Sequence, residues 1–361
     1  MVLRIVADDL TGALDTAAPF AAALGPLPVC WDHAARSGSH ALDTETRERN
    51  ADAFDWVHHL AGAALSFKKI DSLLRGRTAD EIVACLEGGR FRSAIIAPAF
   101  PAQDRITRLG RQYWRPAGQR AWQPVDVDLL LELRRSLPIV HAKSAKVLAA
   151  DGFFLCDAET EEQLDAIVAA GRRMTGPMLW CGSAGLARAL AGPARSKAFV
   201  PGSPLLMLIG SQHAVSRAQH AAIEAQKPEL VTALRATEKA AIETAVADVV
   251  AAIGRGTSAA LAADLPAGSP EDACRVLATT FALIAERMPR PGSVLVTGGE
   301  TLFGLLQALG ATSLVVTGEL MPGVPHARIV GGQWHELAVV SKSGGFGAPD
   351  LLIRLAESVM P

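Results

Sequence analysis

The stretch of sequence that decides the fold is LRIVADDLTG, residues 3–12. Residues 3–7 are apolar enough to form a short buried strand, and Asp8 and Asp9 follow where that run stops. In open α/β sheets, ligands bind beyond the carboxyl ends of parallel strands. The sequence therefore predicts that both carboxylates lie at a ligand site, where they hold a metal ion, a sugar hydroxyl or a transferable proton. The alternative is that Asp9 or Thr11 only caps the following helix, because both residue types are favourable at the N-cap.

Length, charge and cysteine usage narrow the class of protein. The chain has 361 residues, enough for two domains, and a net charge of -2 at pH 7 argues against nucleic-acid or membrane-surface partners. The N-terminal apolar run predicts no signal peptide, and no segment predicts a membrane span. The five cysteines lack metal-binding spacing and resemble small buried apolar residues of a reducing compartment. We expect a cytoplasmic protein with small-molecule ligands, and the sequence is compatible with a homo-oligomer.

Segments typical of strands alternate with segments typical of helices along both halves of the chain. This alternation predicts an α/β fold of two domains, each with a mostly parallel sheet flanked by helices. Residues 192–204, which contain two glycines and three prolines, are the candidate linker. We therefore expect one domain in residues 1–195 and a second in residues 202–361.

Three local predictions concern the neighbourhood of the first strand. Pro19 falls inside an apolar helical stripe, so the helix should kink there or be restricted to Pro19 onward. Residues 41–47 are predicted to form a short strand that places Arg47 at its end, and residues 51–64 a helix.

A second polar stretch, FKKIDSLLRGR, occupies residues 67–77. Lys69, Asp71, Ser72 and Arg75 fall within one loop and the turn after a predicted strand. A site for an anion needs a cation, a hydroxyl and close backbone approach together, and this stretch supplies all three. The alternative is a solvated loop with local ion pairs.

The second half of the chain contains turns that suit a phosphate. Gly298 and Gly299 lie between a predicted strand and a helix, where a turn without side chains leaves amide groups free. Residues 342–347, KSGGFG, form a similar glycine turn after a predicted strand. Ser211 follows the predicted strand 205–209. We expect Ser211 either to bind a phosphate or ribose or only to cap a helix. Neither glycine turn is a Walker A loop or a GxGxxG motif. Because GxGxxG is the dinucleotide-binding pattern of dehydrogenases, a dehydrogenase is the less favoured interpretation. Together they predict a nucleotide site.

Six stretches, taken in order, are similar to the four-carbon acid sugar kinase family, whose members phosphorylate tetronates such as threonate, erythronate or 3-oxo-tetronate with ATP. They are residues 5–13, 69–76, 97–101, 298–301, 322–325 and 342–347. The resemblance implies that the N-terminal domain binds the sugar acid and the C-terminal domain binds ATP, with the active site in the cleft between them. It also implies Mg²⁺ on the phosphate groups.

The resemblance assigns roles residue by residue. It implies that Asp9 or Asp71 acts as the catalytic base, with Asp9 favoured. The expected contacts to the sugar acid are Asp8, Arg47, Lys69, Ser72 and Arg75. Its carboxylate would be held by the three cations of that set. The expected contacts to ATP are Ser211, Gly298, Gly299, Glu300, Thr301 and Gly344. The sequence identifies no metal ligands.

Some positions depart from the family pattern, and two other functions are open. The departures are Asp104, Leu302, Phe303, Gly345 and a shortened segment at residues 110–128. One alternative is a catalytically degenerate paralogue that binds a sugar acid or nucleotide as a sensor. The other is an aspartyl phosphatase, although such enzymes carry a second carboxylate two residues after the first, whereas Asp8 and Asp9 are adjacent.

Overall fold

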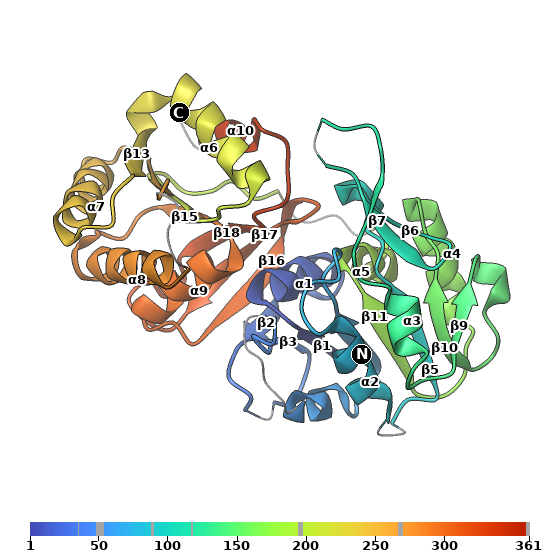
Figure 1. The fold of residues 1–361 in the computed structure, drawn as a ribbon. Coiled ribbons are helices and arrows are strands. Elements are labelled where there is room, and N and C mark those ends of the chain that lie inside the picture. The colour runs from blue at the N-terminus through green and yellow to red at the C-terminus, as the bar shows by residue number, and fades with distance from the viewer. Residues whose placement is uncertain are drawn as a thin grey trace. The chain divides into compact units, whose positions relative to one another are not determined.

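The computed structural model describes residues 1–34, 36–47, 54–87, 90–116, 118–193, 198–265 and 270–358. The chain divides into two compact units, Met1–Arg195 and Ser196–Pro361, and each is described by itself. Both are built from a sheet with helices packed on it, as the ribbon in Figure 1 shows. The predicted α/β class with mostly parallel sheets is therefore confirmed.

Unit 1 contains a parallel sheet of apolar strands that are buried on both faces. In order across the sheet, the strands are β2 (Leu27–Cys30), β3 (His40–Asp43), β1 (Leu3–Ala7), β4 (Leu65–Lys69), β11 (Met178–Gly182), β5 (Ser93–Ala97), β10 (Gly152–Cys156) and β9 (Ile139–Ala142). A small antiparallel sheet follows β5 along the chain. Its strands are β6 (Arg105–Arg108), β7 (Arg111–Trp114) and β8 (Gln123–Pro124).

Helices pack on both faces of this sheet. One group consists of α1 (Leu10–Leu24), α4 (Glu161–Gly171) and α5 (Ala184–Ala191). The other consists of η1 (Asp55–Leu60), α2 (Thr78–Glu87) and α3 (Leu129–Leu133), whose apolar residues share one core cluster. Phe67 of β4 packs against Phe20 of α1, while the next residue, Lys68, lies over Trp56 of η1. Because side chains alternate along a strand, α1 and η1 cover opposite faces. Short 3₁₀ helices η2 (Pro101–Gln103) and η3 (Ala145–Val147) lie in the connections.

Unit 2 repeats the layered arrangement with a mixed sheet. In order, its strands are β13 (Val231–Leu234), β14 (Ala259–Ala263), β12 (Leu205–Ile209), β15 (Ser293–Thr297), β18 (Ala338–Lys342), β17 (Val324–Val330) and β16 (Ser313–Met321). The first five are parallel, and β17 pairs antiparallel with both β18 and β16. Helices α7 (Lys239–Gly254), α8 (Pro270–Arg287) and α9 (Gly299–Ala308) pack together, as do α6 (Ala214–Gln226) and α10 (Leu351–Glu357). A short 3₁₀ helix, η4 (Pro228–Leu230), precedes β13.

Each sheet has a point where consecutive connections leave in opposite directions. In unit 1, β1 leads through α1 to β2 on one side, whereas β4 leads through α2 toward β5 on the other. In unit 2, β12 leads through α6 to β13, whereas β15 leads through α9 toward β16. Loops that diverge in this way leave a crevice at the carboxyl ends of the two strands, which is where open α/β sheets bind ligands.

Helix α1 begins at Leu10, where Asp9 caps it, and runs through Pro19, so the helix is not restricted to the residues from Pro19 onward. Two other local predictions were wrong. Strand β3 ends at Asp43, so Arg47 lies in a turn rather than on a strand. Of the predicted helix 51–64, residues 51–53 lie outside the described residues, and the remainder forms only the 3₁₀ helix η1.

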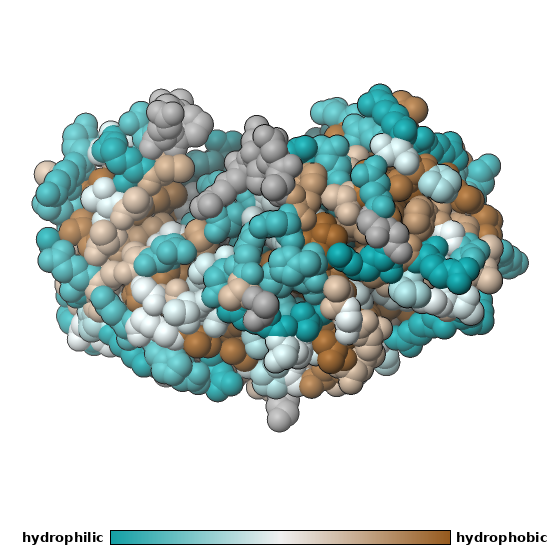
Figure 2. Space-filling view, turned by 90° about the horizontal axis from the view of Figure 1, so that it is seen from below, coloured by the Kyte–Doolittle hydropathy of each residue, from teal (hydrophilic) through white to brown (hydrophobic). Residues whose placement is uncertain are grey.

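The expectation that the cysteines are buried is confirmed for four of the five and is wrong for Cys274, which lies on the exposed side of α8. Figure 2 shows a face on which hydrophilic and hydrophobic residues are interspersed. Within the described ranges, no helix is both long enough and apolar enough to cross a membrane. The five cysteines are free thiols, four of them buried and Cys274 exposed. The buried four therefore act as small apolar residues of the core.

Two buried histidines, His40 of β3 and His59 of η1, make the stability of unit 1 sensitive to acid. Their rings are 2% and 3% exposed and lie 5.9 Å apart. Burial lowers the pKa of His40 from 6.5 to about 4, and burial together with His58 lowers the pKa of His59. Between these values the unfolded chain therefore binds protons that the folded chain does not.

We predict that the free energy of unfolding falls as the pH is lowered from about 6.5 toward 4. The slope for His40 approaches about 1.4 kcal/mol per pH unit, because only the unfolded state takes up its proton. Chemical unfolding of the wild type and of His40→Gln at several pH values measures this slope. The variant should show a shallower dependence, and equal slopes in the two proteins would contradict the assignment to His40.

Candidate active site

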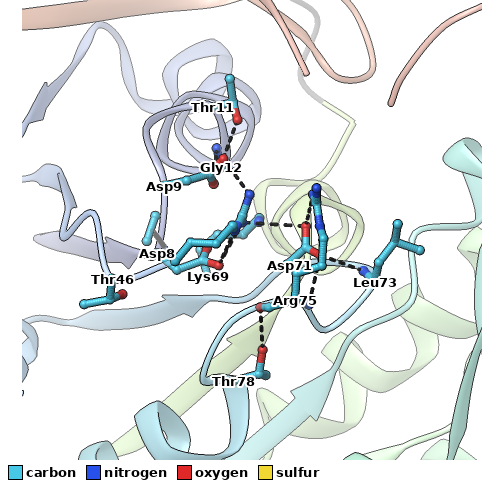
Figure 3. A network of polar contacts seen from close by, with 12 residues as sticks. Asp8, Asp9, Thr11, Gly12, Thr46, Lys69, Asp71, Leu73, Arg75 and Thr78 are labelled. Carbon is cyan, nitrogen blue, oxygen red and sulfur yellow. Dashed lines mark hydrogen bonds and ion pairs between the residues drawn. The ribbon is translucent and has the colours of Figure 1, made fainter. Parts of the chain in front are cut away.

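The carboxyl ends of β1 and β4 bring together the charged residues that the sequence identified in unit 1 (Figure 3). Arg47 is the centre of this group. Its guanidinium donates from Nε to Asp8 Oδ2 over 2.9 Å and lies 2.7 Å from Asp9 Oδ2 and 3.6 Å from Asp71 Oδ1. Its backbone N–H also donates to the carbonyl of Asp8 over 3.1 Å, which holds the turn against β1. Arg47 is therefore occupied by carboxylates of the protein itself, and its role is to neutralise them.

Asp9 is both a helix cap and a member of this group. Its Oδ1 accepts from the Gly12 N–H over 2.9 Å, and its Oδ2 accepts from the Thr11 hydroxyl over 2.6 Å. Burial would raise the pKa of Asp9, but Arg47, Lys69 and the Thr11 hydroxyl outweigh it and hold that pKa below its usual value. With 17% of its side chain exposed, Asp9 is more accessible than Asp8 or Asp71. Asp9 thus caps α1 and still presents an ionised carboxylate.

Asp8 lies deeper and behaves differently. It is 3% exposed, and its Oδ1 has no hydrogen-bond partner among the described residues. Burial raises its pKa despite the opposing charges of Arg47 and Lys69. The two adjacent aspartates therefore have shifts of opposite direction, because only Asp9 has hydrogen bonds on both oxygens.

The loop after β4 is built around Asp71. Arg75 binds this carboxylate with two side-chain hydrogen bonds of 2.8 Å, and the amides of Leu73 and Arg75 each donate to it over 3.2 Å. Leu74 adopts a left-handed φ of 58°, which closes the loop. Burial would raise the pKa of Asp71, but Arg47 and Arg75 hold it well below its usual value. Arg75 keeps 52% of its side chain exposed, so it can also reach a ligand.

Two consecutive lysines at the end of β4 point to opposite faces of the sheet. Lys69 lies on the α1 face beside Gly12. Lys68 is fully buried on the other face, 2.7 Å from Glu81 Oε2 of α2, and Glu81 also accepts from the Thr46 hydroxyl. Sequence analysis missed Lys68, Glu81 and Thr46, although two adjacent lysines in a strand buried on both faces are a signal that one must be buried.

The small antiparallel sheet of β6, β7 and β8 contacts the Asp71 loop. Gln112 of β7 donates to the carbonyl of Ser72 over 2.8 Å and accepts from the Thr107 hydroxyl over 2.7 Å. Ser72 itself is 6% exposed. Arg105 of β6, which sequence analysis also missed, is buried near this loop. Burial lowers its pKa to about 10, against the charges of Asp71 and Asp104.

In unit 2, the predicted nucleotide residues gather at the carboxyl ends of three adjacent strands, β12, β15 and β18. Gly298 has a left-handed φ of 97° and donates its N–H to the carbonyl of Lys342 over 2.9 Å, so the turns after β15 and β18 are joined. A Cβ on Gly344 would overlap Ser211 Oγ and lie 3.0 Å from Ser211 Cβ. Only glycine fits there. The three turns therefore meet around Ser211 and leave the amides of α9 uncovered by side chains.

Buried polar side chains hold the Gly344 turn in shape. Ser216 of α6 donates to the carbonyl of Gly344 over 2.9 Å, and Gln219 donates to that of Phe346 over 3.0 Å. Lys342 is fully buried, and its ammonium group donates to the carbonyls of Ser343 and Phe346 over 2.8 and 3.0 Å. Sequence analysis did not assign these supporting roles. Those of Ser216 and Gln219 depend on contacts with a distant segment, whereas that of Lys342 depends on its burial.

Glu300 and Thr301 occupy the first turn of α9 in different ways. Thr301 is 3% exposed, and its hydroxyl packs beneath Gly210 and Gly298. Glu300 is exposed, and its carboxylate would repel a phosphate, so its backbone amide is the group suited to one. The turn thus contributes backbone donors, while Thr301 fills the space below them.

The described residues contain no group of three or more histidines, cysteines, aspartates or glutamates arranged to hold a metal ion. The three aspartates at β1 and β4 are close to one another, and Arg47 lies against all three.

Two family models match the chain, and they divide it as the two sheets do. Residues 3–127 match the family described as a sugar-binding N-terminal domain. Residues 206–352 match the family described as a nucleotide-binding C-terminal domain. The carboxylate and lysine cluster lies within the first, and the glycine turns lie within the second.

Named relatives are similar along most of the chain. A D-threonate kinase of Bordetella bronchiseptica is 32% identical and covers 99% of this chain and 97% of its own. A D-threonate kinase of Cupriavidus necator is 31% identical over 89% of both chains, and a D-erythronate kinase of Heliobacterium modesticaldum is 26% identical over 99% and 98%. A solved structure from Salmonella typhimurium LT2 has the same fold, with a TM-score of 0.77, 18% identity and 99% coverage of both chains.

We predict that Glu81→Gln destabilises unit 1 by about 3–5 kcal/mol, because it leaves the Lys68 ammonium buried without its counter-charge. The free energy of unfolding from chemical denaturation measures this. Glu87→Gln, an exposed position on the same helix, is the matched control and should change stability by less than about 0.5 kcal/mol. Equal stability of the two variants would show that the buried pair contributes nothing.

Proposed function

The chain belongs to the four-carbon acid sugar kinase family, and from that premise we propose that it transfers a phosphoryl group from ATP to a four-carbon sugar acid. The acceptor class is threonate, erythronate or 3-oxo-tetronate. The names of the relatives support the acceptor class, and the description of the matched C-terminal domain supports a nucleotide as donor. The observation that carries the proposal is that each unit gathers its predicted ligand residues at the point where its strand connections diverge.

The residues at β1 and β4 suit both functional groups of a sugar acid. A carboxylate is bound by cations, and two lie here: Lys69, and Arg75, which also pairs with Asp71 in its own loop. Lys69 has no ion-pair partner among the described residues, and Arg75 is half exposed. A hydroxyl needs an acceptor, and Asp9 Oδ1 accepts one hydrogen bond from Gly12 and has capacity for another.

Asp9 is better suited to orient the acceptor hydroxyl than to remove its proton. Its lowered pKa makes it a weak base, and phosphoryl transfer depends mainly on alignment and on neutralisation of charge. Asp71 is held by four hydrogen bonds within its own loop and shapes that loop. We therefore infer that Asp9 orients the acceptor hydroxyl, a role that differs from the catalytic base implied by the resemblance.

In unit 2, the amides at the start of α9 and the Ser211 hydroxyl suit the phosphate groups of ATP. Gly298 and Gly344 keep this surface free of side chains, so phosphate oxygens can approach the backbone closely. Mg²⁺ carried by the phosphates would neutralise their charge.

The proposed function predicts ADP formation when the protein is incubated with ATP, Mg²⁺ and a tetronate. A coupled assay across D-threonate, L-threonate, D-erythronate and 3-oxo-tetronate measures it, with glycerate and threitol as acceptors of other length or charge. Release of phosphate from a phosphorylated tetronate without nucleotide would instead indicate a phosphatase. Ligand-induced stabilisation without any ADP would indicate a sensor.

We predict that Asp9→Asn lowers kcat/KM by about 10²-fold or more, because asparagine keeps the helix cap but weakens the alignment of the acceptor. Steady-state kinetics and unfolding curves measure the two effects separately. Asp128→Asn is the matched control, since Asp128 also caps a helix and pairs with an arginine, Arg111 at 3.0 Å, outside the site. Full turnover by Asp9→Asn would remove Asp9 from the mechanism.

We predict that Gly344→Ala raises the Kd for ATP by at least about tenfold, because the new methyl group displaces Ser211. Calorimetry with ATP and with the sugar acid separates the two sites, and only ATP binding should weaken. Gly254→Ala is the control, because a Cβ at this helical position would contact nothing within 4 Å. Unchanged ATP affinity in Gly344→Ala would refute the assignment of this turn.

A further inference from the structure

Unit 1 contains a cavity of about 760 Å³ at the end of its sheet opposite the charged group. Its walls come from the first residues of β4 and β11 and from the last turns of α1, α4 and α5. The described residues that line it include none of those assigned to the sugar acid. The cavity is therefore a separate place in the same unit, and its size is that of a small-molecule site.

Most of the cavity wall is apolar. Phe20 of α1 and Trp180 of β11 line it and are 2% and 5% exposed. Ser66 of β4 also lines it, but its hydroxyl donates to the carbonyl of Leu60 over 2.9 Å and is satisfied within the protein. Leu24, at the end of α1, belongs to the wall and is 48% exposed. A ligand that removes this apolar surface from water is stabilised by doing so.

The charged residues of the cavity wall are arginines. Arg172, the C-cap of α4, donates to the carbonyl of Leu190 in α5 over 2.7 Å, and Arg90 donates to the carbonyl of Val57 over 2.7 Å. Neither forms an ion pair with a described residue, and no acidic residue is among the described residues of the wall. A carbonyl satisfies one N–H of a guanidinium but does not neutralise it. The positive charge of the wall is therefore left without a counter-charge.

Two donors of the wall are available to an anion. Leu190 lines the cavity, so the Arg172 guanidinium bound to its carbonyl lies at the wall as well. Trp180 is the second, because within the described part of the chain no group accepts a hydrogen bond from its indole N–H. A tryptophan this deeply buried usually finds such a partner. The wall thus combines apolar surface with unused donors, as small-molecule sites do.

We propose that this cavity binds a small carboxylate with an apolar body, with the carboxylate on Arg172 and the body against Phe20 and Trp180. The unneutralised arginines select an anion, because a guanidinium forms charge-assisted hydrogen bonds with a carboxylate. The apolar wall selects a ligand with an apolar body, since a fully hydroxylated acid would leave that wall in water. Such a ligand differs from a tetronate, so the site goes beyond the proposed function and does not rest on it.

Two fluorescent dyes with the same ring system test the role of Arg172. Anilinonaphthalene sulfonate is anionic, and phenylnaphthylamine is the same molecule without the sulfonate. We expect Arg172→Met to raise the Kd of the anionic dye by about tenfold or more and to leave that of the uncharged dye unchanged. Arg173→Met is the matched control, because exposed Arg173 donates to the Ala169 carbonyl of its own helix over 2.9 Å and does not line the cavity. An equal Kd of the anionic dye in the wild type and Arg172→Met would overturn the proposal.

Filling the cavity tests its location. Ala23 is an exposed residue of α1 in the wall, so Ala23→Trp should weaken both dyes. Ala166→Trp, at an exposed position of α4 outside the cavity, is the control and should retain both. Unchanged binding of the dyes by Ala23→Trp would overturn the assignment to this cavity.

Competition identifies the class of ligand. Octanoate, a carboxylate with an apolar chain, should displace the anionic dye, whereas acetate and D-threonate should not. Displacement by D-threonate would place the dye in the acceptor site and overturn the proposal. Failure of the wild type to bind either dye would overturn it too, and an oligomer that Ala23→Trp dissociates in sedimentation would then identify a second copy as the occupant. None of these measurements uses ATP, so their result does not depend on the proposed function.

Discussion

The contact on which the charged group of unit 1 depends is the pairing of Arg47 with the carboxylates around it. Asp8, Asp9 and Asp71 come from the ends of two neighbouring strands, and Arg47 together with Lys69 and Arg75 supplies the positive charge that offsets their mutual repulsion. Arg47 is held in turn by its backbone hydrogen bond to the carbonyl of Asp8. The guanidinium suits this role because its fork of donors reaches several oxygens in fixed directions. The acidic group and its cations are therefore a framework in which charge is balanced at the carboxyl ends of β1 and β4.

In both units, a buried lysine fixes the loop that follows a central strand. Each has a fully buried lysine at or next to the end of a central strand, Lys342 at the end of β18 and Lys68 one residue before the end of β4. Each lysine donates to the carbonyl of the residue that follows it, over 3.0 Å in Lys68 and 2.8 Å in Lys342. The first turn of the loop is thereby fixed from within the protein, and its outer surface is left to bind a ligand. Rigid loops at the carboxyl ends of strands are what a reaction governed by alignment requires.

The amino-acid sequence alone determined the class of fold and the positions of the two candidate sites along the chain. Apolar strands that stop at Asp8 or at Gly298 are local signals, because the residues that form the strand and those that follow it are contiguous. The cap at Asp9 is local for the same reason, since its partner Gly12 is three residues away. Adjacent carboxylates and paired glycines were therefore readable before the structure was known.

Only the tertiary structure decided which charged side chains pair with one another within the protein and which do not. Arg47 is separated from Asp8 by 39 residues and Lys68 from Glu81 by 13, and no local pattern specifies such pairings. The opposite pKa shifts of Asp8 and Asp9 also depend on Arg47 and Lys69, which come from elsewhere in the chain. The turn at Arg47 was mispredicted for the same reason. Local propensity yields to packing and to charge pairing, which exist only once distant segments have met.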